Sequence, residues 1–380
     1  GGVVEDWSVV YRVSLFGFLG AMIFGAVASK THFCIMGSVS DWINMGSKVR
    51  FRAWVLSMGI AILGAQVMMQ TGLIDLNETI YRGPSFGWAG FLIGGILFGI
   101  GMTLGAGCGQ RTLVRVGGGN LKSLVVLIVM AITAYATLRG VLAPVRIDVL
   151  GSLSVDLAMH EINNQGIDTL IAHWTGLSLK IVSVVVAAIL GVGAIIYAIK
   201  DKSFRQSFDN VLAGLTIGVL VCGAWYVTGV IGNDDFEPVP LEAVTFIAPS
   251  ANFLNYIMTW TGSEISFGIA VVCGMIAGSF VYAILTGNFR VETFVAEGDM
   301  RNHLVGGVLM GFGGVLSFGC TIGQGVSGMS TLAMGSLLTL VSIMFGSALT
   351  MKTQYYMLDD GFWVSLRQSL SDLKLWPQKP

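Results

Sequence analysis

The chain has 380 residues and a net charge of −1; 54% of its residues are hydrophobic and only 11% are charged. Soluble domains carry about 25% charged residues, so this composition argues against a large soluble helical protein and favours one embedded in a bilayer. The balanced charge gives no basic field, and we expect no nucleic-acid partner. Five cysteines without a C-x-x-C pair predict neither a disulfide framework nor a zinc module.

Nine apolar runs are long enough to cross a bilayer, which takes about 20 residues per helix. None of the seven prolines falls inside a run, as expected, because proline removes a helix donor and clashes with the preceding turn. In chain order the predicted spans cover residues 12–29, 53–71, 87–107, 122–142, 179–199, 210–231, 266–286, 303–319 and 335–351.

Lysine and arginine residues are unevenly distributed over the segments between these spans. If the chain starts outside, the inner segments hold sixteen of them and the outer segments five. Cytoplasmic loops carry the excess of positive charge, so we expect a periplasmic N-terminus and a cytoplasmic C-terminus. The segment 232–265 has five acidic residues and no Lys or Arg, which also favours the outer side.

An internal repeat links the two halves. Segments 92–108 and 304–320 are identical at nine of seventeen positions at a constant offset of 212, including the final Gly-Cys pair. The same offset pairs Cys34 with Phe246, and both lie in short, partly apolar segments after the first span of a half. Each half is therefore interpreted as four spans with half-crossing segments. One connecting span between the halves inverts the second half relative to the first, as in many secondary transporters.

This interpretation divides the chain into four parts. Residues 1–143 form the first repeat unit, and 144–208 form an outer loop, the fifth span and an inner loop. Residues 209–352 form the second, inverted unit, and 353–380 form a cytoplasmic tail. The predicted fold is an all-α integral membrane protein with about nine transmembrane helices, re-entrant half-helices and two inverted four-span repeats around a central constriction.

Three cysteines lie at the predicted turns, whereas Cys222 and Cys273 lie in plain apolar helix. Re-entrant tips from two inverted units should converge, so we expect Cys34, Cys108 and Cys320 to line a substrate pathway. Such polar, glycine-rich backbone is tolerated at membrane depth only where it is buried in protein or lines a cavity. The pathway residues expected beside the cysteines are Gly107, Gly109, Gln110, Arg111, Gly319 and Gln324.

Basic residues flank these turns, and half-helix N-termini add partial positive charge. Thiols, glycine backbone and cations together suit an anion with a soft atom. Metal binding by the three thiols is an alternative, but no histidine or acid beside them supports it, so we expect no metal and no cofactor. His32 and His303 are interpreted as interfacial residues, and the regular glycine spacings as close helix packing.

Several segments together resemble the YeeE/YedE family of bacterial sulfur-compound transporters over nearly the whole chain. They are HFCIMGSVSDW, GGILFGIGMTLGAGCG, GAWYVTG, VTFIAPSANFLNYI, GNFRVETF and HLVGGVLMGFGGVLSFGCTIGQGVS. The resemblance implies an hourglass-shaped bacterial inner-membrane protein for thiosulfate uptake, with three cysteines along the constriction at Cys34, Cys108 and Cys320. It also implies a cytoplasmic sulfur-carrier partner of the TusA type.

Other functions stay open at this point. Some relatives of the family are linked to selenium or other sulfur compounds, so the solute could differ within the same fold. A membrane sulfurtransferase would use one reactive cysteine, with Arg111 lowering the pKa of the Cys108 thiol. A sensor or structural subunit is a third alternative. We expect a transporter rather than an enzyme.

Overall fold

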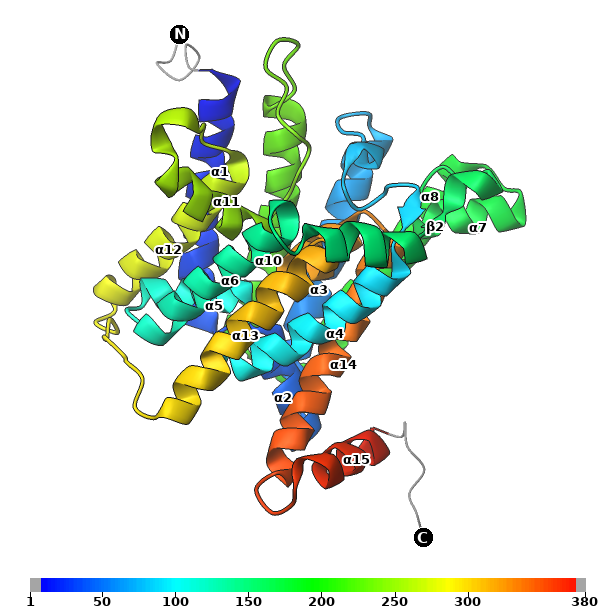
Figure 1. Cartoon of the computed structure of the whole chain (residues 1–380). Coiled ribbons are helices and arrows are strands. Elements are labelled where there is room, and N and C mark those ends of the chain that lie inside the picture. Colours follow the sequence, from blue (N-terminus) through cyan, green and yellow to red (C-terminus); the bar gives the residue numbers. More distant parts are fainter. Residues whose placement is uncertain (1–7, 374–380) are drawn as a thin grey trace.

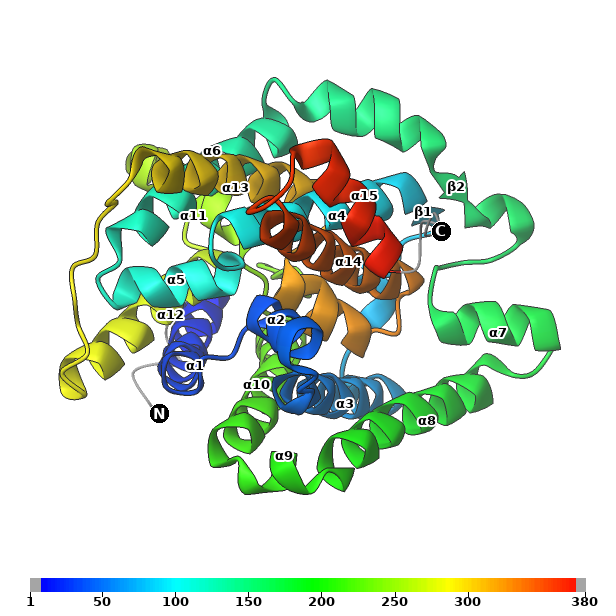
Figure 2. The same cartoon turned by 90° about the horizontal axis from the view of Figure 1, so that it is seen from below.

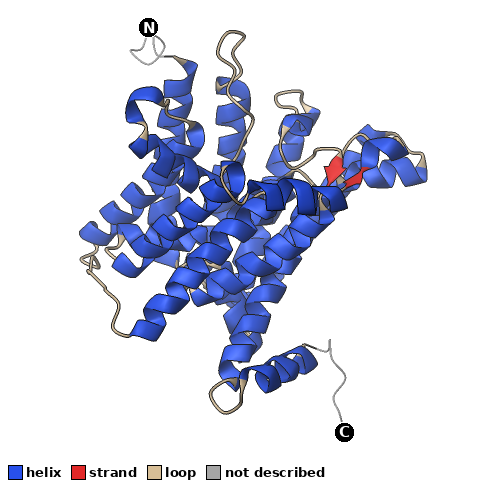
Figure 3. Ribbon diagram, viewed as in Figure 1, coloured by secondary structure: helices blue, strands red, loops and turns tan. Residues whose placement is uncertain are grey.

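The computed structural model describes residues 8–373, and these form almost only helices (Figures 1 and 3). Nine helices in this part of the chain have 17 residues or more: α1 (Val9–Thr31), α3 (Val49–Gln70), α4 (Trp88–Leu104), α6 (Leu121–Arg139), α8 (Leu179–Lys200), α10 (Phe208–Tyr226), α12 (Phe267–Leu285), α13 (Glu297–Leu316) and α14 (Met334–Tyr356). Each coincides with one predicted run.

Eight helical stretches are long and apolar enough to cross a membrane. The protein is therefore an all-α integral membrane protein. The remaining long helix, α13, begins with the charged residues Glu297, Asp299 and Arg301, and becomes apolar only after these first turns. It packs against α4 on one side and α6 on the other.

Four short helical segments begin where the sequence predicts half-crossing segments. They are α2 (Ile35–Met45), α5 (Gly109–Gly117), α11 (Ile247–Met258) and the π-helix η7 (Gly323–Gly328). Cys34, Cys108 and Phe246 directly precede the first three, and Cys320 precedes the helical turn that contains η7. Seen from below, α2 lies near the middle of the molecule beside α3 and α14 (Figure 2).

The long helices pack in related pairs. Helix α1 packs on α12 as α10 packs on α3, and α4 packs on α14 as α13 packs on α6. Glycines on α4 and α13 allow the closest approach: a methyl group on Gly94 would lie 2.7 Å from the Gly313 oxygen, and one on Gly313 2.5 Å from the Gly94 oxygen. Gly101 and Gly306 oppose each other in the same way. Small residues let helix backbones approach closely in lipid.

The segment between α6 and α8 contains more structure than a plain loop. Its elements, with those of the loop after α3, are η1 (Leu76–Glu78), β1 (Ser85–Phe86), η2 (Val145–Leu150), η3 (Gly151–Leu153), β2 (Val155–Asp156), η4 (Leu157–His160) and α7 (Ile167–Thr175). The two strands pair antiparallel, Ser85 with Asp156 and Phe86 with Val155. The other small elements are α9 (Lys202–Gln206), η5 (Val227–Ile231), η6 (Trp260–Gly262) and α15 (Phe362–Asp372).

A fully buried ion pair joins this segment to the rest of the molecule. Arg82 lies 2.9 Å from Asp168 of α7, and neither side chain is exposed to solvent. Arg82 also donates to Asn164, Thr169 and the backbone oxygen of Thr331, which follows η7. A buried charge is tolerated only when it is paired and hydrogen-bonded, so these contacts must form together. They connect three parts of the molecule: the loop after α3, helix α7 and the end of the η7 turn.

Residues 353–380, predicted as a tail, continue α14 to Tyr356 and form α15. Helix α15 packs back on α14, with Ser369 buried beside Thr353 and a 3.1 Å ion pair between Lys352 and Asp372. Residues 374–380 and 1–7, and with them both predicted chain ends, lie outside the described residues. Below, the end of the molecule where α1 begins is called the N-terminal face, and the opposite end, where α15 lies, the C-terminal face (Figure 1).

Candidate substrate pathway

The first cysteine turn connects α1 to α2. His32 adopts a left-handed backbone conformation that ends α1, and Cys34 is extended and begins α2. Arg50 of α3 donates to the His32 carbonyl at 2.8 Å and lies 3.4 Å from Asp41. The turn is therefore clamped from α3, and the thiol of Cys34 is buried.

The second turn connects α4 to α5. Ala106 has a φ of 58°, an uncommon left-handed conformation for a residue with a side chain, and Arg115 stabilises it by donating to the Ala106 carbonyl at 3.0 Å. Cys108 then begins α5 and is fully buried, with its thiol 3.9 Å from Oε1 of Gln110. The Nε2 of buried Gln110 has no hydrogen-bond partner among the described residues.

The third turn connects α13 to the η7 turn and repeats the backbone of the second. Phe318 has a φ of 57°, at the offset of 212 from Ala106. Cys320 is fully buried, and its sulfur accepts a 3.3 Å hydrogen bond from the Gly323 amide. The Thr245 side chain also contacts this sulfur. Gln324 stabilises the turn, because it donates to the Ser317 carbonyl and accepts from Ser336.

The three turns meet inside the molecule. The Cys34 and Cys108 thiols are neighbours in the interior. The Cys108 thiol also lies near the hydroxyl of Thr321, the residue that follows Cys320. The buried Thr321 oxygen also lacks a protein partner among the described residues. Unpaired buried polar groups in native structures call for an explanation such as water or a ligand. Together, the thiols of Cys34, Cys108 and Cys320 with Gln110 and Thr321 are called the thiol cluster below.

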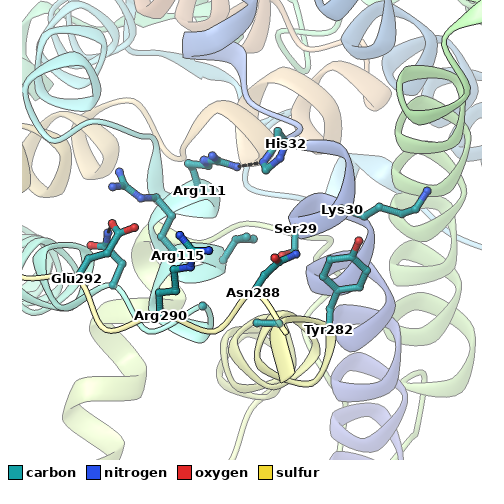
Figure 4. Close-up of a pocket in the computed structure, with 13 residues that line it drawn as sticks. Ser29, Lys30, His32, Arg111, Arg115, Tyr282, Asn288, Arg290 and Glu292 are labelled. Carbon is teal, nitrogen blue, oxygen red and sulfur yellow. Dashed lines mark hydrogen bonds between the residues drawn. The ribbon is translucent and has the colours of Figure 1, made fainter. Parts of the chain in front are cut away.

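A cavity of about 600 Å³ opens at the C-terminal face beside this cluster. Five of its lining residues carry basic side chains and one is acidic; they are Lys30, His32, Arg111, Arg115, Arg290 and Glu292. In Figure 4, Arg111 and His32 point toward each other; Nη1 of Arg111 is 3.4 Å from Nδ1 of His32. Within residues 8–373, the three arginines form no salt bridge, so the cavity holds a net positive charge in which an anion can be bound.

The opposite face has a second cavity of about 500 Å³, between the ends of α3 and α10. Its charged lining residues are acidic, Asp75 and Glu78, and it also includes Thr228 and Leu241. Glu242 follows Leu241, and burial raises the pKa of this carboxyl to about 7. Buried Tyr81 lies near both Cys320 and Glu242; burial first, and then these two groups, raise the pKa of its hydroxyl.

A family model described as sulphur transport matches residues 30–349 of the chain. The chain belongs to this family. The resemblance to the YeeE/YedE family is thereby confirmed. The chain is 26% identical over 329 residues to the thiosulfate transporter TsuA of Escherichia coli (strain K12), covering 83% of this chain and 88% of that protein. It is also 26% identical over 336 residues to the thiosulfate transporter TsuA of Spirochaeta thermophila, covering 87% and 96%.

Of the pathway residues predicted for this sulphur transport protein, Cys34, Cys108, Cys320 and Gln110 come together in the thiol cluster. Gly109 lies against Ile247, where an added methyl group would be 3.0 Å from its Cδ1 atom. Gly107 and Gly319 pack on Arg111 and Gln324 of their own turns. Arg111 lines the cavity at the C-terminal face, whereas the Gln324 side chain is occupied by its two structural hydrogen bonds.

Sequence reasoning missed four residues beside the sulphur transport family's cysteine turns: Thr321, Thr245, Tyr81 and Glu242. Thr321 stands directly after Cys320, and this adjacency was the one available signal. The other three come from connecting segments that only the folded chain brings near Cys320. His303, expected at the interface, is buried in α13 and pairs with Asp299 at 3.1 Å.

Proposed function

We propose that the chain takes up thiosulfate, or a closely related sulfur anion, across the bacterial inner membrane through the thiol cluster. The observation that carries this proposal is the convergence of three turns that each bury a cysteine, with Cys34 beside Cys108 and Cys108 beside Thr321, next to a cavity whose arginines form no salt bridge within the described residues. Weak S–H donors suit the soft terminal sulfur of thiosulfate, because transport needs binding that is loose enough for release. The names of the two relatives support the same solute. Selenium compounds of similar shape are the alternative solutes within this fold.

The orientation of the chain in the membrane and its two inverted repeat units are part of the same proposal. Helices α4 and α13 pack antiparallel, with Gly94 opposite Gly313 and Gly101 opposite Gly306. Equivalent helices that pack antiparallel are related by a two-fold axis perpendicular to both. That axis lies in the plane of the membrane, so this packing supports two inverted repeat units at 1–143 and 209–352, joined by 144–208. The charge distribution supports a periplasmic N-terminal face and a cytoplasmic C-terminal face, with 353–380 on the cytoplasmic side.

Entry of a dianion is opposed by an inside-negative potential, at about 4.6 kcal/mol per 100 mV for two charges. The cationic cavity at the C-terminal face offsets part of this opposition by stabilising the anion after it has passed the thiols. Removal of the anion inside would complete uptake. A cytoplasmic sulfur carrier of the TusA type, expected from the family resemblance, would remove it at this face.

Transport, and not covalent sulfur transfer, is the function inferred for the thiols. A sulfurtransferase would require one indispensable cysteine that carries a persulfide, and the other two would tolerate substitution. Proteoliposomes that contain only this chain test the proposal directly. We expect uptake of labelled thiosulfate, competition by selenium analogues and little uptake of sulfate, which lacks the soft sulfur. Absence of thiosulfate uptake, or a persulfide on one cysteine during turnover, would contradict it.

A further inference from the structure

The loop that leads from α10 to α11 contains a half-buried acidic residue, Glu242, on the periplasmic side of the proposed path. The Thr228 hydroxyl donates to the Glu242 carbonyl at 2.7 Å and accepts from the Glu242 amide at 3.3 Å, so the backbone of Glu242 is held at both ends. Leu241 and Thr228 line the cavity at the N-terminal face. Glu242 therefore stands at the inner limit of that cavity.

The same loop continues directly to the thiol cluster. Val244 accepts a 2.7 Å hydrogen bond from Ser327 of η7, and Thr245 contacts the Cys320 sulfur. Tyr81 lies within electrostatic reach of both Glu242 and Cys320. Glu242 thus belongs to the short chain segment that leads from the outer cavity at Leu241 to the Cys320 turn at Thr245.

The charge of Glu242 is not balanced by a cation. In the described part of the chain, no Lys or Arg forms a salt bridge with it. The titratable group that faces it is Tyr81 from the loop after α3, which also lies near Cys320; Asp75 and Glu78 line the cavity beyond it. Helix α10 and η5 contribute the uncharged Thr228. An ionised Glu242 would repel a dianion, and nothing nearby would offset the repulsion.

We propose that Glu242 is a protonation switch in the outer half of the pathway, which admits the anion to Cys320 when its carboxyl is neutral and opposes it when ionised. This inference rests on the proposed function. Burial raises the pKa of Glu242 from 4.5 to about 7, so the switch operates in the range of ordinary external pH. The neutral fraction of such a group falls by about tenfold between pH 6 and pH 8.

The test is thiosulfate uptake by proteoliposomes with the same pH on both sides, so that no proton gradient drives transport. We expect wild-type uptake to fall by about tenfold between pH 6 and pH 8. Glu242→Gln, which keeps the shape but not the charge, should transport at the acid rate at both pH values. Glu237→Gln, an exposed acid in the same loop, is the matched control and should behave as wild type.

Each outcome decides between the two proposals. Uptake by wild type at equal rates at pH 6 and pH 8 would overturn the switch alone, even if Glu242→Gln does not fold. An unchanged pH dependence in Glu242→Gln would also overturn it. No uptake by wild type at any pH would overturn the proposed function, and the switch with it. A second readout does not depend on transport. An anionic thiol reagent added from the periplasmic side should label Cys320 faster at pH 6 than at pH 8, once the labelling rates are divided by those of a neutral reagent, which report the pH dependence of the thiol itself.

Discussion

The two Gly-Cys turns have the same backbone, but different side chains stabilise them. Both contain a residue with positive φ, Ala106 in one and Phe318 in the other, followed by a buried cysteine. In the first turn a guanidinium group, that of Arg115, donates to the turn carbonyl. In the second the neutral amide of Gln324 does so. At the offset of 212, Arg115 corresponds to Ser327.

The surroundings of the turns explain this difference. Helix α5 lines an open cavity, so water and a bound anion can compensate the charges of Arg111 and Arg115. The η7 turn is buried throughout, where an unpaired guanidinium would be strongly destabilising. The turn whose helix lines the cavity therefore carries Arg111 and Arg115, whereas the enclosed turn has glycine and serine at the matching positions and an amide as its hydrogen-bond donor.

The largest expected effect tests what the turns share. Cys34→Ala, Cys108→Ala and Cys320→Ala should each reduce thiosulfate uptake by about tenfold to a hundredfold, because each removes a donor from a dry site. Cys222→Ala and Cys273→Ala, in α10 and α12, are the controls and should transport normally. Uptake in proteoliposomes, normalised to reconstituted protein, measures this. Equal activity of all five variants would mean that the thiols only pack.

The second prediction concerns the two side chains that hydrogen-bond the turn carbonyls, Arg115 and Gln324. Gln324→Ala should lower the free energy of unfolding by about 2–3 kcal/mol, since the Ser317 carbonyl and the Ser336 hydroxyl lose their partner in a fully buried site. Arg115→Gln should lower it by about 1 kcal/mol, because water reaches this turn. Thermal unfolding in detergent compares the two. A larger loss of stability in Arg115→Gln than in Gln324→Ala would contradict the view that burial decides which side chain stabilises each turn.

The third prediction sharpens the electrostatic contrast. Arg111→Gln should reduce uptake by about fivefold, a modest effect because the guanidinium is partly exposed and screened by water. Arg111→Lys keeps the charge and should retain most of the activity. Lys202→Gln, an exposed cation of α9, serves as control. If Arg111→Gln and Lys202→Gln transport equally well, Arg111 only anchors the loop.

The smallest expected effect is on thermal stability, through Glu242 near the N-terminal face. The pKa of Glu242 is raised from 4.5 to about 7, so wild type loses stability as pH rises through this interval, while Glu242→Gln does not. The variant should therefore unfold at a temperature higher by about 2 °C at pH 8, with the difference vanishing toward pH 4.5. Scanning calorimetry at the two pH values measures this difference. Glu237→Gln should show none.

Sequence reasoning predicted the regular part of the fold well, since long apolar runs report directly on membrane helices. The nine predicted runs all became helices, with ends that differ by only a few residues for most of them. The convergence of the turns at Cys34, Cys108 and Cys320 was predicted from the repeat and the half-crossing segments, and the role of these cysteines in transport stays a prediction. The contrast between Arg111 and its counterpart Gly323 was also readable from the offset, once the turns were aligned.

Other parts depended on contacts between distant segments. Arg82 reads as an ordinary loop cation, and its partner Asp168 follows 86 residues later in a stretch without any motif. Glu242 stands among four other acids of segment 232–265, and only its place in the folded chain distinguishes it from Glu237, since Glu242 is half-buried and Glu237 exposed. The π-helix η7 was unexpected as well, because its glycine-rich sequence gives no periodic signal.

The Arg82 ion pair also has a consequence for the order in which the protein is built. The guanidinium group is synthesised well before Asp168, and the Thr331 carbonyl that it also binds follows 249 residues later. Asp168 follows 86 residues after Arg82 and Thr331 much later, so the positive charge lacks its full set of partners until then, and an incompletely paired charge resists removal from water. The loop after α3 must therefore stay hydrated until the last third of the chain is inserted. The first half of the chain therefore reaches its final fold only with the second half, and water leaves the surroundings of Arg82 only when the whole chain is in place.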